Sequence, residues 1–304
     1  MIAIASVLAL LVMVVDLVRG DGRGPRPAPA PVANALPANS GPPGTKPILP
    51  GFGPLLLSGP LPAASKQQAA LDRYKALGLP IFCGGTQHKY LALTFDDGPG
   101  PQTEKVMRML SEAGQRATFF TIGREVPKAP NLPRQAALSG AVGNHTFNHP
   151  DLTKLDRIVM ASELQQGKDA LEAATGQQVQ LFRPPYGARN QAVDLQIAQL
   201  GMLDVVWDVD TQDAIGATAP QVIDSAKEGM KRGAIILMHE NRPQTLVALP
   251  RILKMLQRKA YRSVTIPELL ALNPPSDELV TGGFIACFRA EKRTDTRVFG
   301  PTGA

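Results

Sequence analysis

Short apolar runs alternate with longer amphipathic stretches over most of the chain, from Cys83 to about Leu272. The runs read KYLALTF, RATFFTI, SGAVGNH, QVQLFRP, LDVVWDVD, GAIILMH and YRSVTI. Strands that alternate with helices indicate parallel β/α units, and seven of them favour a closed or nearly closed barrel over an open doubly wound sheet. We therefore expect the α/β class and a (β/α)7-type barrel.

The amphipathic stretches carry helix signals. The segment PQTEKVMRMLSEAG has apolar residues on one helical face and a glycine stop. The segment SKQQAALDRYKALG opens with Ser65 and Gln68 at capping-box spacing and closes with Gly78. The segment from residue 153 has Thr153 and Asp156 at its start and a long helical pattern after them. Ordered structure is expected to begin at the helix of Ser65.

The N-terminal part differs from this pattern. Residues Ile2 to Val15 are apolar, which matches the length of a secretory hydrophobic region and is short for a membrane span. Residues 1–19 are therefore expected to be a signal peptide or a membrane anchor, with possible membrane contact. Residues 20–64 are rich in Pro, Ala and Gly and indicate a semi-rigid linker. We expect an exported protein that is periplasmic, secreted or membrane-anchored outside the cytoplasm.

The composition of the 304 residues is that of a globular protein, with 44% hydrophobic and 19% charged residues. The formal net charge of +6 suits anionic surroundings such as an acidic glycan or a membrane surface. No block of Lys and Arg marks a nucleic-acid site, so we expect no nucleic-acid partner. The composition leaves the oligomeric state open.

The chain has two cysteines, Cys83 and Cys287, which flank nearly all the patterned sequence. In an exported protein they could form a disulfide that joins the ends of the domain. Two buried free thiols fit the same pattern.

Polar residues gather where the predicted strands end. In β/α barrels, functional side chains lie at the carboxyl ends of the strands, on one rim. The polar residues at these ends are Asp96 and Asp97, His145, Arg183, Asp210 and Asp213, and His239. We therefore expect the active site at the C-terminal rim of the barrel.

The segment GNHTFNHP places His145 and His149 four residues apart. Two imidazoles and one carboxylate form a catalytic type of zinc site, which keeps positions open for water and substrate. The adjacent carboxylates of Asp96 and Asp97 suit this chemistry, because one can bind the cation while the other accepts a proton from water. A simple turn would also explain DDG, but the apolar strand that leads into it favours a functional role.

Five segments, taken in order, resemble the motifs of the polysaccharide deacetylases, the NodB-homology domain of carbohydrate esterase family 4. They are TFDDGP, NHTFNH, RPPYG, DTQD and LMH. The resemblance spans about residues 85–270 and implies a distorted barrel within a domain at 65–275. It implies hydrolysis of acetyl groups on carbohydrate polymers with a divalent metal, most often Zn²⁺. The C-terminal tail, residues 276–304, has no counterpart in the family.

The resemblance also implies which residues bind the metal and activate the water. Asp97, His145 and His149 would be the metal ligands, and Asp96 would be the general base. Arg183 would keep Asp96 ionised and oriented by a charge-assisted hydrogen bond.

Further roles follow from the resemblance on the leaving-group side. The backbone N–H of Tyr186 would stabilise the oxyanion, and Leu237 would line the pocket for the acetyl methyl group. His239 would protonate the departing amine or alcohol, with Asp213 keeping it cationic. Ala214 stands where the family usually has Trp, which makes the acetyl site wider and the substrate range open.

The expected substrate is an acetylated extracytoplasmic polysaccharide, with peptidoglycan or a chitin-like N-acetylglucosamine polymer favoured over acetylated xylan. One alternative is an O-acetyl xylan-type esterase. A second is a C–N hydrolase of small amides on the same barrel, against which the complete triad of Asp97, His145 and His149 argues. A third is a non-catalytic glycan-binding barrel, which would need neither Asp96 nor His239.

Overall fold

The computed structural model describes residues 60–289 of the chain. The predicted signal peptide or anchor, most of the predicted linker and the last part of the predicted tail lie outside these residues. Among residues 60–289, no helix is long and apolar enough to cross a membrane.

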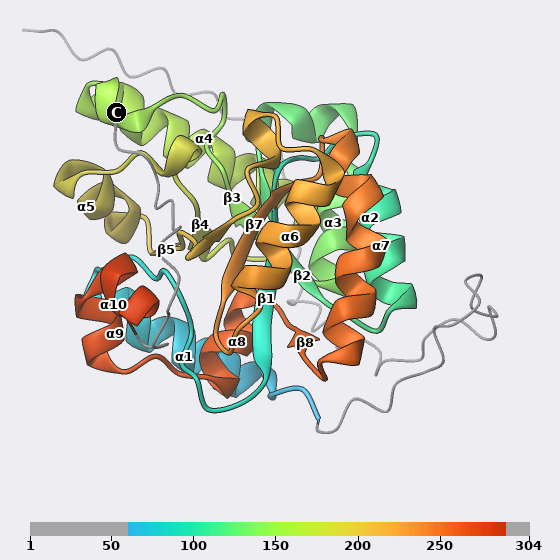
Figure 1. Cartoon of the computed structure of the whole chain (residues 1–304). Helices are drawn as coiled ribbons and strands as arrows, with labels where there is room; N and C mark the ends of the chain where they lie inside the picture. Colours follow the sequence, from blue (N-terminus) through green and yellow to red (C-terminus); the bar gives the residue numbers. More distant parts are fainter. Residues whose placement is uncertain (1–59, 290–304) are drawn as a thin grey trace, which may run out of the picture. The chain divides into compact units, whose positions relative to one another are not determined.

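Helices and strands alternate through the described residues (Figure 1). The strands are β1 (Tyr90–Gly98), β2 (Ala117–Thr121), β3 (Ala141–Asn144), β4 (Leu181–Phe182), β5 (Leu203–Asp204), β6 (Val209–Asp210), β7 (Ile235–His239) and β8 (Arg262–Ser263). The α-helices are α1 (Ala64–Leu77), α2 (Thr103–Glu112), α3 (Asn131–Ser139), α4 (Arg157–Thr175), α5 (Gln191–Gln199), α6 (Ala219–Gly229), α7 (Pro243–Arg258), α8 (Ile266–Leu272), α9 (Asp277–Thr281) and α10 (Gly283–Arg289). The 3₁₀ helices are η1 (Gly123–Lys128), η2 (Leu152–Lys154), η3 (Pro185–Gly187) and η4 (Asp213–Ile215).

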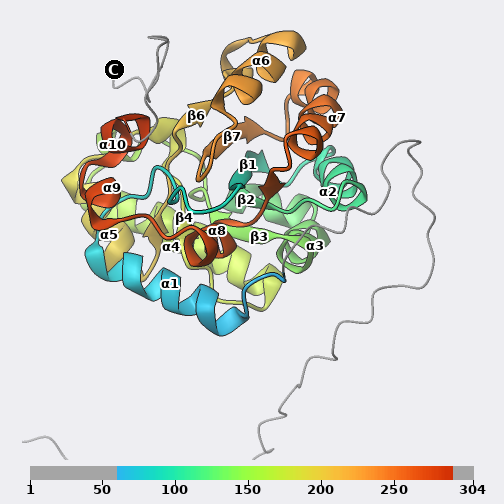
Figure 2. The same ribbon diagram turned by 60° about the horizontal axis from the view of Figure 1, so that its bottom comes forward.

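The strands form one parallel sheet in the order β5-β4-β3-β2-β1-β7-β6, with β8 also paired to β1. Figure 2 shows the strands in the middle, with the helices arranged around them. Strands β5 and β6 stand at opposite ends of this order, but they follow each other closely in the sequence. The sheet must therefore curl round until its two ends meet, and its seam lies between β5 and β6. The distorted (β/α)7-type barrel predicted from the alternation is confirmed.

The single strand predicted over LDVVWDVD is wrong, because this run contains two short strands, β5 and β6. The first pairs with β4 and the second with β7, at the two sides of the seam. Between them, Val205 pairs with Ile81, a residue that precedes the sheet in sequence. The chain changes partners within one apolar run, so that run cannot remain a single strand.

The predicted capping box at the start of the first helix is not formed. Helix α1 begins at Ala64, and its N-cap residue, Ala63, makes no side-chain capping bond. The predicted stop is confirmed, because Gly78 takes the left-handed conformation, with φ of 61°, at the end of the helix.

Helix α4 starts later than the sequence indicated. Asp156 is its N-cap, and the Asp156 carboxylate accepts hydrogen bonds from the backbone N–H groups of Ile158 and Val159. Thr153 belongs to the preceding 3₁₀ helix, η2. The carboxylate was the stronger cap because it accepts two of the unpaired donors of the first turn.

The core lies on both faces of the central strands. One cluster joins β1, β2 and β7 to α2, α6 and α7, and another joins the same sheet to α1, α8 and the C-terminal helices. Leu91, Leu93 and Phe95 of β1 are fully buried. The strands whose ends carry the polar residues are therefore held rigidly from both sides.

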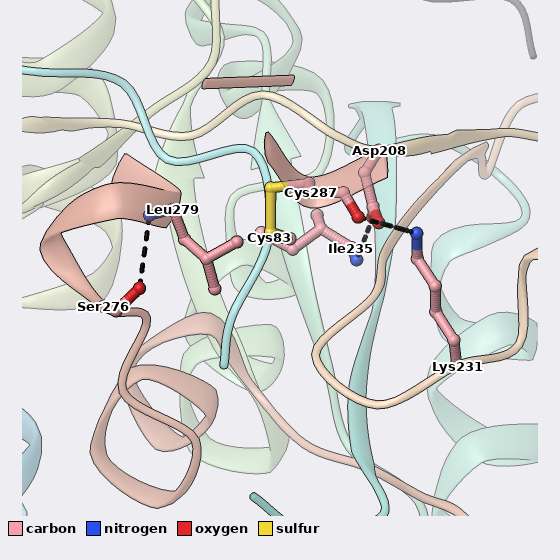
Figure 3. The surroundings of a disulfide bond; sticks show 7 residues. All are labelled: Cys83, Asp208, Lys231, Ile235, Ser276, Leu279 and Cys287. Atoms are coloured by element: carbon pink, nitrogen blue, oxygen red, sulfur yellow. Dashed lines mark hydrogen bonds and ion pairs between the residues drawn. A yellow bond between two sulfur atoms is a disulfide. The ribbon is translucent and has the colours of Figure 1, made fainter. Parts of the chain in front are cut away.

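The described part of the predicted tail packs against this core. Its helices α9 and α10 bury Val280 and Cys287, and Cys287 forms a disulfide with Cys83 (Figure 3). Beside the bridge, Lys231 pairs with Asp208 at 3.1 Å and donates to the carbonyl of Cys287 at 3.3 Å. Of the two arrangements open for the cysteines, the structure contains the disulfide.

Candidate active site

Strand β1 delivers two carboxylates to the rim, those of Asp96 and Asp97. Asp97 has φ of 72°, so the chain turns sharply there and the two side chains do not simply alternate as in a regular strand. Gly98 follows because a Cβ atom at that position would lie 1.2 Å from a carboxylate oxygen of Glu240. The glycine thus lets β1 end directly against the end of β7.

Asp96 is buried and held by Arg183. The guanidinium Nη1 donates to Oδ1 of Asp96 at 2.8 Å. Arg183 has no exposed surface, and its Nε and Nη2 donate to the carbonyls of Val205 and Val206. Its guanidinium also lies 4.1 Å from the ring centroid of Phe120. Because every part of the guanidinium is engaged, it fixes the orientation of the Asp96 carboxylate.

Asp97, His145 and His149 come together at the rim, and their candidate ligand atoms lie within 4.8 Å of one another. Oδ1 of Asp97 is 3.4 Å from Nε2 of His149 and 3.8 Å from Nε2 of His145. That oxygen is buried and has no hydrogen-bond donor. The Nδ1 atom of His145 lies 2.7 Å from the carbonyl of Arg183, which sets the tautomer and leaves Nε2 to the site. This donor set fits Zn²⁺ or a similar divalent cation.

The protonation states of two of these residues agree with that fit. Burial, and then the neighbouring His145, lower the pKa of His149 to about 4. Burial alone would raise the pKa of Asp97, but the charges of His145, His239 and His149 outweigh it and lower that pKa. At neutral pH His149 is neutral and Asp97 ionised, which are the forms that bind a metal ion.

His239 ends strand β7, and Asp213 holds it. Nδ1 of His239 lies 2.7 Å from Oδ1 of Asp213, and the backbone N–H of His239 donates to Oδ2. Thr245 also donates to the Asp213 carboxylate. Burial opposes the charged imidazole, but the hydrogen bond and charge of Asp213 prevail and raise the pKa of His239 to about 9. His239 is therefore a cation at neutral pH.

Three further predicted positions lie around this centre. Tyr186, in η3, has φ of 61°, and its ring centroid lies 4.8 Å from that of His149. Leu237 is buried in β7, two residues before His239. Ala214 is exposed in η4, and the neighbouring Ile215 is 80% exposed, so position 214 supplies no aromatic ring to this edge of the site.

Asp210 lies at the end of β6, as expected from the sequence, but its role is local. Its Oδ1 accepts a hydrogen bond from the backbone N–H of Gln212 at 2.7 Å. Burial raises its pKa, which this hydrogen bond opposes. The contact is that of a carboxylate that stabilises a turn.

Sequence reasoning missed two residues that directly follow His239. Nδ2 of Asn241 donates to Oδ2 of Asp97 at 3.3 Å, which leaves Oδ1 facing the imidazoles. Glu240 is buried beside Gly98, and burial raises its pKa to about 8 against the opposing hydrogen bond of Thr103. The rule that locates functional residues at strand ends would have found both, had it been extended past the histidine.

Comparison with known sequences adds independent information. The family described as polysaccharide deacetylase matches residues 84–205. A peptidoglycan-N-acetylglucosamine deacetylase from Bacillus cereus is 35% identical over 60% of this chain and 88% of its own. A chitooligosaccharide deacetylase from Rhizobium leguminosarum is 31% identical over 62% of this chain and 96% of its own.

Some relatives are much longer. The match covers 31% of a bifunctional xylanase/deacetylase from Pseudobutyrivibrio xylanivorans, at 34% identity over 60% of this chain. Among solved structures, a family 4 carbohydrate esterase from Streptomyces lividans in complex with acetate matches with a TM-score of 0.55 and 37% identity. It covers 60% of this chain and 92% of its own.

Proposed function

Because this chain belongs to the polysaccharide deacetylase family of carbohydrate esterases, we propose that it hydrolyses the N-acetyl groups of N-acetylglucosamine units in a glycan polymer. The products are acetate and the free amine of the sugar. The relatives from Bacillus cereus and Rhizobium leguminosarum support this substrate class, since they act on peptidoglycan and on chitooligosaccharides.

A single geometric observation supports this reaction most strongly. Asp96 and His239 are register partners on the neighbouring strands β1 and β7. The triad of Asp97, His145 and His149 adjoins Asp96, whose Oδ2 is 3.7 Å from Nε2 of His145. Asp96 can accept a proton and His239 can donate one, and both lie at one level of the barrel beside the triad. This arrangement suits hydrolysis, whereas glycan binding alone would need neither group.

Asp97, His145 and His149 would hold the divalent cation. A cation there supplies Lewis-acid chemistry, which polarises a carbonyl group and lowers the pKa of water toward about 7. Family membership supports metal dependence, and two histidines with one carboxylate favour Zn²⁺.

Asp96 would act as the general base, accepting a proton from water as its oxygen attacks the acetyl carbonyl. Arg183 keeps the carboxylate oriented toward the site through the 2.8 Å charge-assisted hydrogen bond. The backbone N–H of Tyr186 would donate to the oxygen on which negative charge develops. Leu237 would contact the methyl group of the acetyl.

His239 would act as the general acid. As the C–N bond breaks, its imidazolium gives a proton to the departing nitrogen, which leaves as a neutral amine. Asp213 holds the imidazole by its Nδ1 atom, so Nε2 is the atom that carries the transferable proton. The raised pKa of His239, about 9, keeps this proton available at neutral pH.

The same proposal extends to where the protein acts. The disulfide between Cys83 and Cys287 is typical of oxidising compartments. With the apolar segment of residues 2–15 and the linker after it, the bridge supports export to the site of an extracytoplasmic glycan. Cell fractionation with thiol labelling tests this, because a cytoplasmic pool with both thiols free would contradict export.

The test of function is acetate release by the purified protein, zinc-loaded and chelator-stripped, on chitin oligosaccharides, peptidoglycan, acetylated xylan and a small N-acetyl amide. We expect zinc-dependent release from the polymers of N-acetylglucosamine. Release from xylan alone would instead identify an O-acetyl esterase. Release from a small amide without metal would identify a C–N hydrolase of another class.

A further inference from the structure

We propose that Glu163 of α4 is a positioning residue of the metal site. Its carboxylate fixes the loop His145–His149 and thereby the positions of the two imidazoles. The inference rests on the proposed function, because it takes Asp97, His145 and His149 to hold a divalent cation. In the described part of the chain, the hydrogen bonds of the Glu163 carboxylate come from this loop and not from the triad or the rim residues assigned to the reaction, so Glu163 acts through the loop.

The carboxylate of Glu163 accepts three hydrogen bonds from the loop. Its Oε2 accepts from the backbone N–H groups of Phe147, at 3.2 Å, and Asn148, at 2.8 Å. Its Oε1 accepts from Nδ2 of Asn148 at 2.7 Å. Glu163 is only 9% exposed, so these bonds are shielded from water. All three donors belong to the two residues that separate Thr146 from His149.

The loop needs such an external partner because its own backbone is strained. Thr146 has φ of 67° and His149 has φ of 64°, both in the left-handed region that residues other than glycine rarely adopt. Within the loop, the Thr146 hydroxyl accepts from the backbone N–H of His149 at 2.8 Å. The N–H groups of Phe147 and Asn148, between the two strained residues, bond to Glu163 instead. The backbone N–H groups of Gly123 and Arg124 hold the carbonyls of Thr146 and Phe147, at 2.9 and 3.0 Å, and the carboxylate of Glu163 stabilises the strained conformation from the donor side.

Helix α4 is packed closely enough to transmit this constraint. Gly167, one turn after Glu163, has no room for a side chain, since a Cβ atom there would lie 2.3 Å from Oδ1 of Asn144 and 2.8 Å from the carbonyl of Thr146. Nδ2 of Asn144 donates to the carbonyl of Leu164 at 2.8 Å. The helix thus contacts the loop and the strand before it, and its carboxylate cannot move independently of them.

The two histidines depend on Glu163 to different degrees. The ring of His145 is also fixed by the carbonyl of Arg183 at 2.7 Å. Apart from its triad neighbour Asp97, at 3.4 Å, the ring of His149 is held by the Tyr186 hydroxyl at 3.2 Å, and Tyr186 is itself 64% exposed. His149 therefore depends more than His145 on the loop backbone that Glu163 holds, so loss of Glu163 displaces the imidazole of His149 first.

The test compares two substitutions at this position by the zinc affinity of the purified full chain. Glu163→Met keeps the length and helix propensity of the side chain but removes the acceptors. Glu163→Gln keeps an acceptor for the two backbone donors, and the amide of Asn148 can reverse to pair with the new NH₂ group. We expect Glu163→Met to raise the Kd for Zn²⁺ about 10- to 100-fold, and Glu163→Gln to remain within a few-fold of the unaltered protein.

Glu172→Met is the matched control on the same helix. Glu172 accepts from the backbone N–H of Val179 at 2.9 Å and pairs with Lys168, so it too holds a loop to α4, near the end of the helix remote from the histidines. Its loss should lower the Tm of the metal-free protein and leave the Kd for Zn²⁺ unchanged. Each Kd is measured by chelator competition, at a temperature well below the Tm of every metal-free variant.

Two results would overturn the positioning role: an unchanged Kd for Glu163→Met, or an equal loss of affinity in Glu163→Gln, Glu163→Met and Glu172→Met. An unaltered protein that binds no Zn²⁺ would overturn both this inference and the proposed metal site. If the unaltered protein binds Zn²⁺ and releases no acetate, the proposed function fails while the zinc measurements still decide the role of Glu163.

Discussion

The carboxylate of Asp96 lies beside the metal-type triad and accepts a charge-assisted hydrogen bond from the fully buried Arg183. Asp96→Asn keeps the size of the side chain but removes the proton acceptor, so we expect kcat to fall about 100- to 10,000-fold. Zinc binding should persist, because Asp97, His145 and His149 are unchanged. Acetate release and zinc content, measured on the same preparation, check both parts. Near-normal turnover would contradict the assignment of the base.

His239 determines the alkaline limit of activity. Its pKa is raised from 6.5 to about 9, because Asp213 outweighs the effect of burial. The imidazolium that donates a proton is present below about pH 9, so kcat should decline as the pH rises through that value. The free energy of unfolding changes with pH in the same direction. The His239–Asp213 interaction stabilises the folded state fully below pH 6.5, and this stabilisation is lost as the pH rises through about 9. A pH–rate profile from pH 6 to 10.5 measures the limb.

The control for this limb is Asp213→Asn, which removes the negative charge that raises the pKa of His239. The alkaline limb should then move to lower pH, because burial alone favours the neutral imidazole. An alkaline limb that stays at the same pH in this variant would mean that another group is responsible for it.

At the residue scale, the sequence predicted the polar groups that stand at strand ends, because strand ends of a β/α barrel share one rim. Asp96 and His239 are far apart in sequence and still pair in register. Glu163 could not be found in the same way. It lies in the middle of a helix, and the contact that matters is with the backbone of a loop that bends back onto that helix.

At the scale of elements, the alternation of apolar runs and amphipathic stretches was enough to predict the parallel barrel. It failed for LDVVWDVD, since nothing local indicates that β5 and β6 pair with different neighbours. It also failed at helix starts, where Thr153 and Asp156 both had capping chemistry and the structure uses Asp156. The first error arises because long-range pairing decides where the run divides, and the second because the Asp156 carboxylate caps two backbone donors of the first turn.

The close contact between α4 and the metal loop gives a prediction at this scale. Gly167→Ala places a methyl group against Asn144 and the backbone of Thr146. We expect the clash to outweigh the gain in helix propensity and to lower the free energy of unfolding by about 1–3 kcal/mol. Zinc affinity should fall as well, because the helix must move away from the loop. Urea unfolding and chelator competition measure the two effects.

Gly176→Ala is the control for that variant. Gly176 caps the same helix with φ of 69°, and no atom lies within 4 Å of the position of a Cβ. Alanine there costs about 1–2 kcal/mol because of the left-handed backbone, and it should not alter zinc affinity. If both glycine variants weakened zinc binding equally, the close approach at Gly167 would have no special role.

For the domain as a whole, the disulfide joins the segment before β1 to the last described helix, and the two cysteines are 204 positions apart in the sequence. Lys231 and Asp208, buried beside it, precede β7 and β6. The bridge therefore lies toward the amino ends of the strands, opposite the rim that carries the candidate site. Loss of the disulfide should therefore lower the stability of the domain without changing its catalytic rate.

The double variant Cys83→Ser/Cys287→Ser tests that separation. Without the cross-link the unfolded chain gains conformational freedom, and the free energy of unfolding should fall by about 2–5 kcal/mol. Part of this loss arises because α10 is no longer tied down and the carbonyl of residue 287 moves away from Lys231. Water then reaches the buried ion pair of Lys231 and Asp208. At 25 °C kcat should be unchanged, since neither cysteine approaches the rim. Urea unfolding of the variant, and of the unaltered protein with and without reductant, checks the stability. A large drop in kcat while the variant remains folded would show that the C-terminal helices influence the active site through the sheet.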